Sequence, residues 1–263
     1  MAFCAVNGAQ AAAVSGQGTW ETTLQARDIN GDGVADAFYD TVLNVTWLAD
    51  ANAAAGTIYD SSGYTTATDG KMTWLDAKAW AANLSVYGLA GWRLPTMVDT
   101  GTSGCVAFAN SGTDCGYNVQ TISADGRTVY SEMAHLYYLT LGNKAYCDAT
   151  GNCALGRAST APNFMLSNTG PLRNMQAWVY WSGVSYAPAP AVSAWYFRSN
   201  LGFQTYFSQS DEYYALAVRP GDVTAAVPEP ETVALMLLGL AAMVVLQRKR
   251  AIRRFDTLAD SAV

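Results

Sequence analysis

Residues 178–186 read WVYWSGVSY and open the part of the chain where the sequence pattern takes a period of two. Aromatic and β-branched residues dominate it, as is typical of β-strands. Three similar stretches follow after Gly, Pro and Ser turns: SAWYFRS (193–199), FQTYFSQ (203–209) and YYALAVRP (213–220). The sequence therefore predicts several short antiparallel strands from Ala177 onward.

Two helices are expected before these strands. The first begins after Thr73, because Asp76 follows three residues later as in a capping box, and the run WLDAKAWAANL (74–84) repeats apolar residues at helical spacing. The second covers residues 132–141, with Ser131 as its N-cap. Early helices and late antiparallel strands predict an α+β fold.

An earlier β-rich run, AFYDTVLNVTWL (37–48), contains a turn near Asp40. We expect the last strand, which ends at Arg219, to pair with the part of this run around residues 42–48. Such a pairing brings the two ends of the domain together.

The chain is acidic, and its basic residues gather at one end. Of its 263 residues, 15 are basic and 21 are acidic, for a formal net charge of −6. Residues 248–263 contain five of the basic residues and only two of the acidic ones, so the rest of the chain is more acidic than the total suggests. Since phosphate binding needs a basic surface, we do not expect nucleic acid as a partner.

Four of the five cysteines form two close pairs. Cys105 and Cys115 flank VAFANSGTD, and Cys147 and Cys153 flank DATGN. Both intervening stretches are rich in small polar residues, so each predicts a loop closed by a disulfide, which requires an oxidising compartment. Neither pair is CxxC and His135 is the only histidine, so a zinc site is not expected.

The two ends of the chain have the composition of targeting segments. Residues 1–18 begin with MAFCAVNGAQAAA, which ends like a signal-peptide cleavage region but lacks a basic n-region. We interpret them as a truncated signal peptide and leader, with a disordered N-terminus as the alternative. At the other end, a linker (224–231) precedes an apolar run (232–247) and a basic tail (248–263). The apolar run is short of the roughly 20 residues that span a bilayer, so a buried core helix is the alternative. The basic block after it favours a transmembrane helix with its C-terminus in the cytoplasm.

The last part of the chain resembles a PEP-CTERM sorting signal, in which a Pro-Glu-Pro motif, an apolar helix and a basic cluster follow one another. The motif is Pro228, Glu229 and Pro230, and the cluster is Arg248, Lys249 and Arg250. Thirteen residues follow the cluster, where the family usually stops sooner. The resemblance implies an exosortase as partner and a transient anchor in the inner membrane. It also implies export to the cell surface or the exopolysaccharide matrix of a Gram-negative bacterium.

Residues from about Phe38 to Val223 resemble the domain named after the C-terminal domain of the Lcl collagen-like adhesin. The matching pieces are MTWLDAKAWAANL (72–84), GWRLPT (91–96), SEMAHLYYLTLGN (131–143), YWSG (180–183), AWYF (194–197) and AVRPGDV (217–223). The resemblance implies that residues 19–223 form a C-type-lectin-like domain, with two helices packed on short antiparallel strands and with long loops. Most members have no known activity, and the namesake adhesin binds host polysaccharides.

Two features of the related folds have no counterpart in this sequence. The sugar-coordinating tripeptides EPN, QPD and WND of C-type lectins do not occur, so calcium-mediated sugar binding of that kind is not expected. The paired active-site cysteines of formylglycine-generating enzymes do not map, because two local disulfides account for the four cysteines. Within GWRLPT, Arg93 lies between Trp92 and Leu94. We expect Arg93 to be a buried structural cation that pairs with a carboxylate or with carbonyls, not a catalyst.

One stretch has the spacing of a calcium loop. Residues 28–36, DINGDGVAD, place Asp28, Asn30 and Asp32 at positions one, three and five, with Gly at position six and Asp36 beyond it. The bidentate Glu expected at position twelve is missing. The stretch therefore predicts either a calcium site or an Asx-rich turn.

Residues 178–207 are dense in aromatic side chains. They carry more rings than one face of a short sheet can bury, and alternation directs neighbouring side chains to opposite faces. We expect the proline-containing loop 187–191 to hold Tyr186 in an exposed position. Tyr186 and Tyr206 would then stack on a sugar ring, and Gln204 would bind its hydroxyls. The alternative is that these rings pack against the two helices.

The function we expect is a non-catalytic, lectin-like domain that binds a glycan or another envelope component. The sequence contains no GxSxG, Walker loop or GxGxxG, and no nucleophile motif accompanies His135. Two alternatives stay open. One is an enzyme that acts on envelope polysaccharide, for which Asp211 and Glu212 are the adjacent acidic pair in the strand region. The other is a structural matrix protein with no specific ligand.

Overall fold

The computed structural model describes residues 12–60, 68–101, 114–117, 121–122, 128–129, 131–148, 150–153 and 165–223. The chain divides into two compact units, residues 1–225 and 226–263. All described residues belong to the first unit, and the helices and strands named below are therefore those of that unit. The transmembrane helix predicted at residues 232–247 lies outside the described residues, and among those residues no helix is long and apolar enough to cross a membrane.

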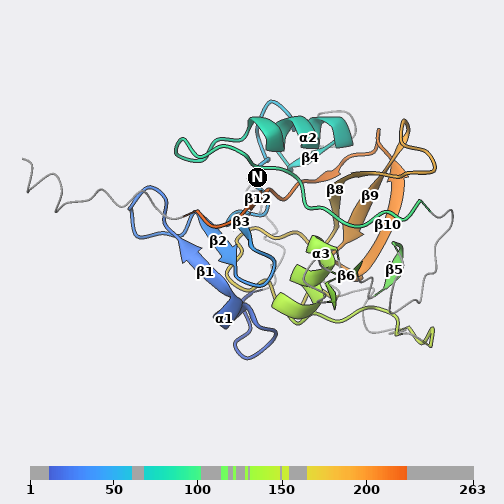
Figure 1. The fold of residues 1–263 in the computed structure, drawn as a ribbon, viewed down its shortest axis with the longest axis horizontal. Coiled ribbons are helices and arrows are strands. Elements are labelled where there is room, and N and C mark those ends of the chain that lie inside the picture. The colour runs from blue at the N-terminus through green and yellow to red at the C-terminus, as the bar shows by residue number, and fades with distance from the viewer. Residues whose placement is uncertain are drawn as a thin grey trace, which may run out of the picture. The chain divides into compact units, whose positions relative to one another are not determined.

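The first unit combines a few short helices with many strands, as in the predicted α+β class (Figure 1). The helices are α1 (Trp20–Thr23), α2 (Trp74–Asn83) and α3 (Glu132–His135), which continues into the π-helix η1 (Leu136–Thr140). A four-stranded sheet contains, in spatial order, β1 (Leu24–Arg27), β2 (Ala37–Asp40), β3 (Val45–Leu48) and β12 (Val218–Pro220). A six-stranded sheet contains, in spatial order, β4 (Lys71–Met72), β11 (Tyr213–Tyr214), β8 (Val179–Ser185), β9 (Ser193–Arg198), β10 (Phe203–Ser208) and β5 (Gly116–Tyr117). The strands β6 (Thr121–Ile122) and β7 (Thr128–Val129) pair with each other.

Helix α2 begins where the sequence predicts. The Thr73 hydroxyl oxygen accepts a hydrogen bond from the Asp76 backbone N–H at 3.3 Å and donates one to the Asp76 carboxylate at 2.6 Å, which satisfies one of the free N–H groups at the helix start. The buried residues of α2 are Trp74, Ala77, Trp80 and Ala81. The Trp74 indole also donates to the Ser182 carbonyl at 2.8 Å, so α2 is held against β8.

The second predicted helix forms, but its second half is a π-helix. Ser131 caps α3 as expected, because its hydroxyl accepts a hydrogen bond from the Ala134 N–H at 3.1 Å. At the end of η1, the Leu141 N–H donates to the Leu136 carbonyl, five residues back, at 2.8 Å. Gly142 follows with a φ of +66°, the left-handed conformation that favours glycine after a helix end.

Residues 12–18, which the sequence assigns to a leader, pack against the domain. Gly18 and Gly142 meet backbone to backbone, since a Cβ on Gly142 would lie 2.5 Å from the Gly18 nitrogen. The Asn168 side chain accepts a hydrogen bond from the Val14 N–H at 2.9 Å and donates one to the Gln17 carbonyl at 3.0 Å. The boundary predicted at residue 19 therefore falls within a segment that is bonded to the domain, and the preceding residues 1–11 lie outside the described residues.

The four-stranded sheet joins the two ends of the domain, as expected. Strand β12 pairs antiparallel with β3, with Val218 opposite Trp47. The predicted turn follows Asp40, whose carboxylate accepts hydrogen bonds from the N–H groups of Val42 and Leu43 at 3.0 and 3.1 Å. The sequence does not predict β1, because its run LQAR mixes polar and apolar residues without a clear period.

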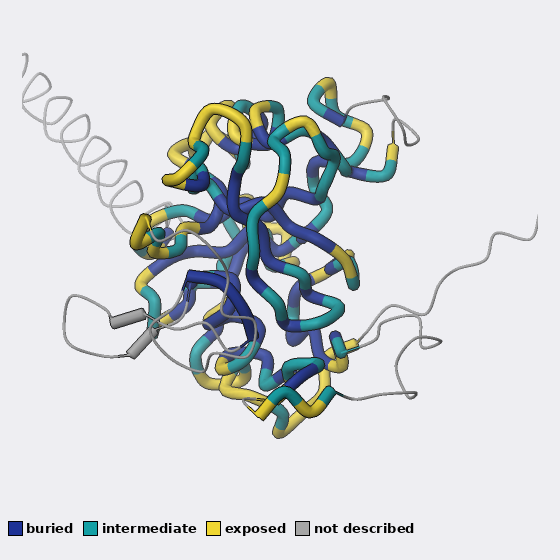
Figure 2. The backbone as a smooth tube through the Cα atoms, turned by 90° about the vertical axis from the view of Figure 1, so that its right-hand side faces the viewer, coloured by how far each residue is buried: buried dark blue, intermediate teal, exposed yellow. Residues whose placement is uncertain are grey.

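The six-stranded sheet lies between two cores. Tyr180 belongs to a core that includes residues of α3 and η1, whereas the next residue, Trp181, belongs to a core that includes α2. The two rings therefore lie on opposite faces, as the alternation of a strand requires. Buried segments run through the middle of the described part and exposed loops lie around them (Figure 2).

Arg93 forms hydrogen bonds with two segments that are distant in the sequence. Its guanidinium donates two hydrogen bonds to the Glu132 carboxylate, at 2.7 and 2.8 Å. Its backbone N–H and carbonyl both pair with Val218 at 2.8 Å. Glu132 therefore is the carboxylate partner that the sequence leads us to expect, but the Arg93 side chain is 32% exposed and is not buried as expected. The contacts of Arg93 link the GWRLPT segment to α3 and β12.

Candidate functional site

Three adjacent strands, β8, β9 and β10, present rows of side chains on one face of the six-stranded sheet. Cross-strand partners in a sheet share a face. One row is Val179, Arg198 and Phe203, the next is Trp181, Tyr196 and Thr205, and Ala194 with Phe207 continues the pattern. We name this surface the Arg198 face.

Helix α2 covers only one end of the Arg198 face. Val179, Trp181 and Tyr196 are buried in the core that contains α2. Toward β10 this cover ends, since Phe203 is partly exposed and Phe207 is 52% exposed. Figure 1 shows α2 beside β4, with β10 and β5 at the other end of the sheet. An aromatic surface is therefore open to solvent along β10.

Trp178, the residue before β8, lies outside these rows but is a neighbour of Arg198. It is 43% exposed, and the Arg198 guanidinium carbon lies 5.2 Å from its ring centroid, which is a cation–π distance. The buried Ser199 fixes this arrangement. Its hydroxyl accepts a hydrogen bond from the Trp178 N–H at 3.0 Å, and its own N–H donates to the Trp178 carbonyl at 2.8 Å.

Phe203 is supported from the neighbouring strand β5. The rings of Tyr117 and Phe203 are 4.8 Å apart and tilted by 54°. Burial raises the pKa of the Tyr117 phenol, although nearby Arg198 acts in the opposite direction, so this phenol stays neutral at ordinary pH. We name the four residues Trp178, Arg198, Phe203 and Phe207 the aromatic strip.

Two of the three predicted sugar-binding residues are buried on the opposite face of the sheet. Tyr186 is 5% exposed and Gln204 is 2% exposed. The Gln204 side-chain amide donates to the Asp114 carbonyl at 2.7 Å. Tyr206 is partly exposed, and its hydrogen bond to Tyr186 raises its pKa. The expected exposure of Tyr186 and Gln204 is therefore wrong, and their part in ligand binding stays a prediction that this burial does not favour.

Tyr186 is buried because of a residue that lies far away in the sequence. One carboxylate oxygen of Asp99 accepts hydrogen bonds from the Ala187 N–H at 2.6 Å and from the Trp195 indole at 2.7 Å. The two bonds draw the start of the 187–191 loop toward Trp195. Tyr186 then packs edge-on against the Trp195 ring, with centroids 5.4 Å apart, and does not project into solvent.

The predicted calcium loop adopts a compact turn. The Asp28 carboxylate accepts hydrogen bonds from the N–H groups of Gly31 and Gly33, both at 2.7 Å. The Asp36 carboxylate accepts one from the Ile29 N–H at 2.8 Å. The side chains of Asn30 and Asp32 bond to each other at 2.8 Å. Among the described residues, no group of three or more His, Cys, Asp or Glu side chains could hold a metal ion, and calcium binding stays a prediction.

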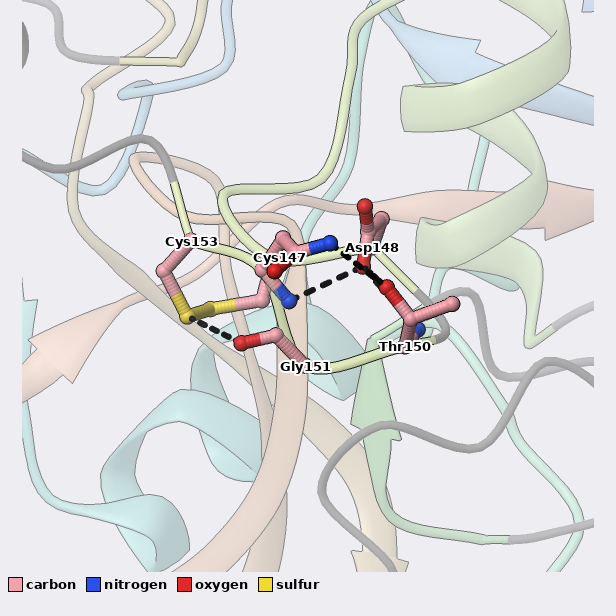
Figure 3. The surroundings of a disulfide bond; sticks show 6 residues. Cys147, Asp148, Thr150, Gly151 and Cys153 are labelled. Carbon is pink, nitrogen blue, oxygen red and sulfur yellow. Dashed lines mark hydrogen bonds between the residues drawn. A yellow bond between two sulfur atoms is a disulfide. The ribbon is translucent and has the colours of Figure 1, made fainter.

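The structure contains the predicted disulfide between Cys147 and Cys153 (Figure 3). Between the two cysteines, Asp148 organises the loop. Its carboxylate accepts hydrogen bonds from the Thr150 hydroxyl at 2.7 Å and from the Asn152 N–H at 3.0 Å, and these contacts lower the pKa of Asp148.

Cys115 is also disulfide-bonded. Its predicted partner, Cys105, lies outside the described residues. That pairing stays a prediction.

The residues that the sequence suggests for a possible enzyme, His135 and Asp211, are not part of the aromatic strip. His135 is a buried residue of α3, only 4% exposed. Asp211 accepts a hydrogen bond from the Tyr213 hydroxyl at 3.1 Å. Burial, and then the charge of Asp211, raise the pKa of Tyr213. Asp211 thus serves as a hydrogen-bond acceptor for a neighbouring tyrosine.

Comparison with known families concerns the tail of the chain. Residues 226–251 match the model of the PEP-CTERM protein-sorting motif. The chain therefore carries the sorting signal of an exported protein that an exosortase processes at the membrane. No curated protein matches the chain, and no solved structure does. The resemblance of residues 38–223 to the Lcl C-terminal domain and to C-type lectins is not supported by these comparisons and stays a prediction.

Proposed function

We propose that this exported protein resides at the cell surface or in the exopolysaccharide matrix, and that its domain binds a carbohydrate through the aromatic strip without catalysing a reaction. The sorting signal at residues 226–251 supports the destination. The binding proposal goes beyond it and rests on the geometry of the domain.

The observation that carries the proposal is the exposure of Trp178 and Phe207, at 43% and 52%. Large rings left in water beside buried ones such as Tyr180, Trp181 and Trp195 are a feature of interaction surfaces. Along β10, side chains of one face recur about every 6.8 Å. Phe203 and Phe207, with Thr205 between them, therefore present two rings about 13.6 Å apart along a line, which suits the apolar faces of two sugars that are not immediate neighbours in an extended chain.

A glycan array tests this function directly. The full-length chain, kept in detergent because of its apolar tail, should bind a reproducible set of glycans. We expect the double variant Trp178→Ala/Phe207→Ala to bind at least about 5-fold more weakly, since each ring contact contributes about 0.5–1.5 kcal/mol and every 1.4 kcal/mol is tenfold.

Tyr87→Asn provides a matched control. Tyr87 is 63% exposed and has a φ of +49°, a conformation that Asn tolerates. This variant removes an exposed ring that lies outside the aromatic strip, and its glycan binding should equal that of the unchanged chain. Binding of no glycan at all, or an equal loss in the control, would contradict the proposal.

A further inference from the structure

Arg198 differs from the other arginines in the described part of the chain. Each of the others donates a hydrogen bond of 2.9 Å or less: Arg27 to Asp222, Arg93 to Glu132, Arg173 to the Ala35 carbonyl and Arg219 to the Ala90 carbonyl. Within the described residues, the Arg198 guanidinium has no hydrogen-bond acceptor and no ion-pair partner, and its Nε is buried without one. Arg198 therefore is a cation without a partner in the described part of the chain, and because its Nε is buried, only its Nη groups can donate to a ligand.

The surroundings of Arg198 are aromatic. Its guanidinium lies 5.2 Å from the Trp178 ring centroid, and its row on the sheet continues into Phe203. Arg198 also acts to lower the pKa of both Tyr117 and Tyr196, which places its charge close to these two phenols. The Asp211 carboxylate acts on Tyr196 as well, but within the described residues it bonds to the Tyr213 hydroxyl and makes no ion pair with Arg198. A partly buried guanidinium without a counter-ion is unfavourable, so an anionic ligand that reaches its Nη groups would be stabilised here.

The aromatic strip has a single positive charge, which limits the charge density of the anion that it can bind. A densely sulfated or phosphorylated polymer needs several cations close together, and the aromatic strip contains one. A single guanidinium matches a planar carboxylate, which can accept two parallel hydrogen bonds from it. The rings on either side add contact area for a sugar that bears that carboxylate.

We propose that Arg198 binds the carboxylate of an acidic sugar, so that the aromatic strip recognises a uronate-containing polysaccharide in preference to a neutral one. This inference rests on the proposed carbohydrate-binding function and adds the substrate class to it. Trp178 holds the guanidinium in place and packs on the same sugar. Phe203 and Phe207 contact the residues that follow along the polymer.

The test compares one polymer in two forms. The full-length chain in detergent is titrated with alginate, whose sugars are all uronates, and with the same alginate after chemical reduction of its carboxyl groups. We expect alginate to bind at least about 10-fold more tightly, as is reasonable for a hydrogen-bonded charge pair. Arg198→Gln should abolish the difference, and Arg198→Lys should keep part of it, because lysine retains the charge but not the planar fork.

Arg173→Gln is the control, because it removes the same charge from an exposed arginine whose partner is the Ala35 carbonyl. It should keep the full preference for alginate. The melting temperature of each variant is recorded. If Arg198→Gln does not fold, the inference is tested by comparing the preference for alginate of the unchanged chain with that of Arg198→Lys. Equal binding of the two polymers would overturn the inference and leave carbohydrate binding intact. Binding of neither polymer overturns it as well, and the glycan array then shows whether the proposed function fails with it.

Discussion

The rings of Tyr186 and Tyr206 stack face to face, with centroids 3.5 Å apart and planes 6° from parallel. Trp195 stands edge-on to both, at 5.4 and 5.5 Å. This cluster lies on the face of the sheet opposite Arg198, and Asp99 closes it through the Trp195 indole. A pair of residues that the sequence suggests as a sugar platform is thus the centre of a small aromatic core.

Replacing Tyr186 should therefore destabilise the domain. We expect Tyr186→Ala to lower the free energy of unfolding by about 3 kcal/mol, as for other buried aromatic residues cut back to alanine. Tyr186→Phe keeps the ring and loses only the hydrogen bond to Tyr206, so it should cost about 1 kcal/mol. Urea unfolding followed by tryptophan fluorescence measures both values. Small and equal losses would show that the ring is not part of the core.

The disulfide between Cys147 and Cys153 should stabilise the domain modestly, because it closes a short loop. We expect the double variant Cys147→Ser/Cys153→Ser to lose about 2 kcal/mol. Asp148→Ala, which removes the acceptor of the Thr150 hydroxyl, should cost less, because that hydrogen bond is exposed. Thermal melts of the two variants give the comparison.

The predicted disulfide between Cys105 and Cys115 is tested by determining which cysteines are linked. Peptide mapping without reduction should find Cys105 linked to Cys115 beside the Cys147–Cys153 link. The short polar stretch between Cys105 and Cys115 is the reason for this prediction. A fragment that joins Cys105 to Cys147 would contradict it.

Local patterns in the sequence predict local structure well in this chain. The spacing of Thr73 and Asp76 marks the start of α2 correctly, because a capping box involves only residues of one turn. The pairing of β12 with β3 is also correct, since both runs are rich in residues that favour strands. For α2 the residues that decide the outcome lie within one quoted stretch, whereas the pairing of β12 with β3 joins Val218 to Trp47, which is 171 residues away.

The candidate site could not be predicted in the same way. A period of two assigns Tyr180 and Trp181 to opposite faces, but it does not say how far α2 extends over either one. The burial of Tyr186 depends on Asp99, 96 residues before Trp195 in the chain. The unpaired state of Arg198 within the described residues is likewise a property of the folded neighbourhood and has no signal in the sequence pattern.

Calcium should raise the melting temperature if the 28–36 loop binds it. An ion present at 100 times its dissociation constant adds about 2.7 kcal/mol to the stability of the folded state. The Asp28 oxygens accept hydrogen bonds from Gly31 and Gly33, so the ion must compete with these N–H groups. Melts in millimolar calcium, and then with chelator, measure the shift. Asp32→Asn should reduce it, and an unchanged melt at millimolar calcium would leave the loop an Asx-rich turn.

The sorting signal predicts the end of the mature protein. Mass spectrometry of the protein recovered from the cell surface should find no peptides beyond the Pro228–Pro230 region, because an exosortase removes the tail there. Replacing both prolines of the motif with alanine should leave the tail attached. Intact tails on most molecules of the unchanged protein would contradict cleavage.

The contact between Arg93 and Glu132 should be a coupled, stabilising pair. Their side chains are 32% and 14% exposed. Removing one partner of a surface ion pair costs about 1 kcal/mol of stability or less, and removing one partner of a buried pair costs about 3–5 kcal/mol. We expect a cost between these two values. We expect Glu132→Gln to cost about 2 kcal/mol, because it leaves the Arg93 charge without its counter-ion and weakens the acceptor of the Thr96 N–H. The double variant Arg93→Met/Glu132→Gln should cost less than the sum of its single variants, since no charge is then left unpaired. Urea unfolding of the unchanged chain, the two single variants and the double variant measures this coupling. Additive losses would show that the two residues stabilise the fold independently.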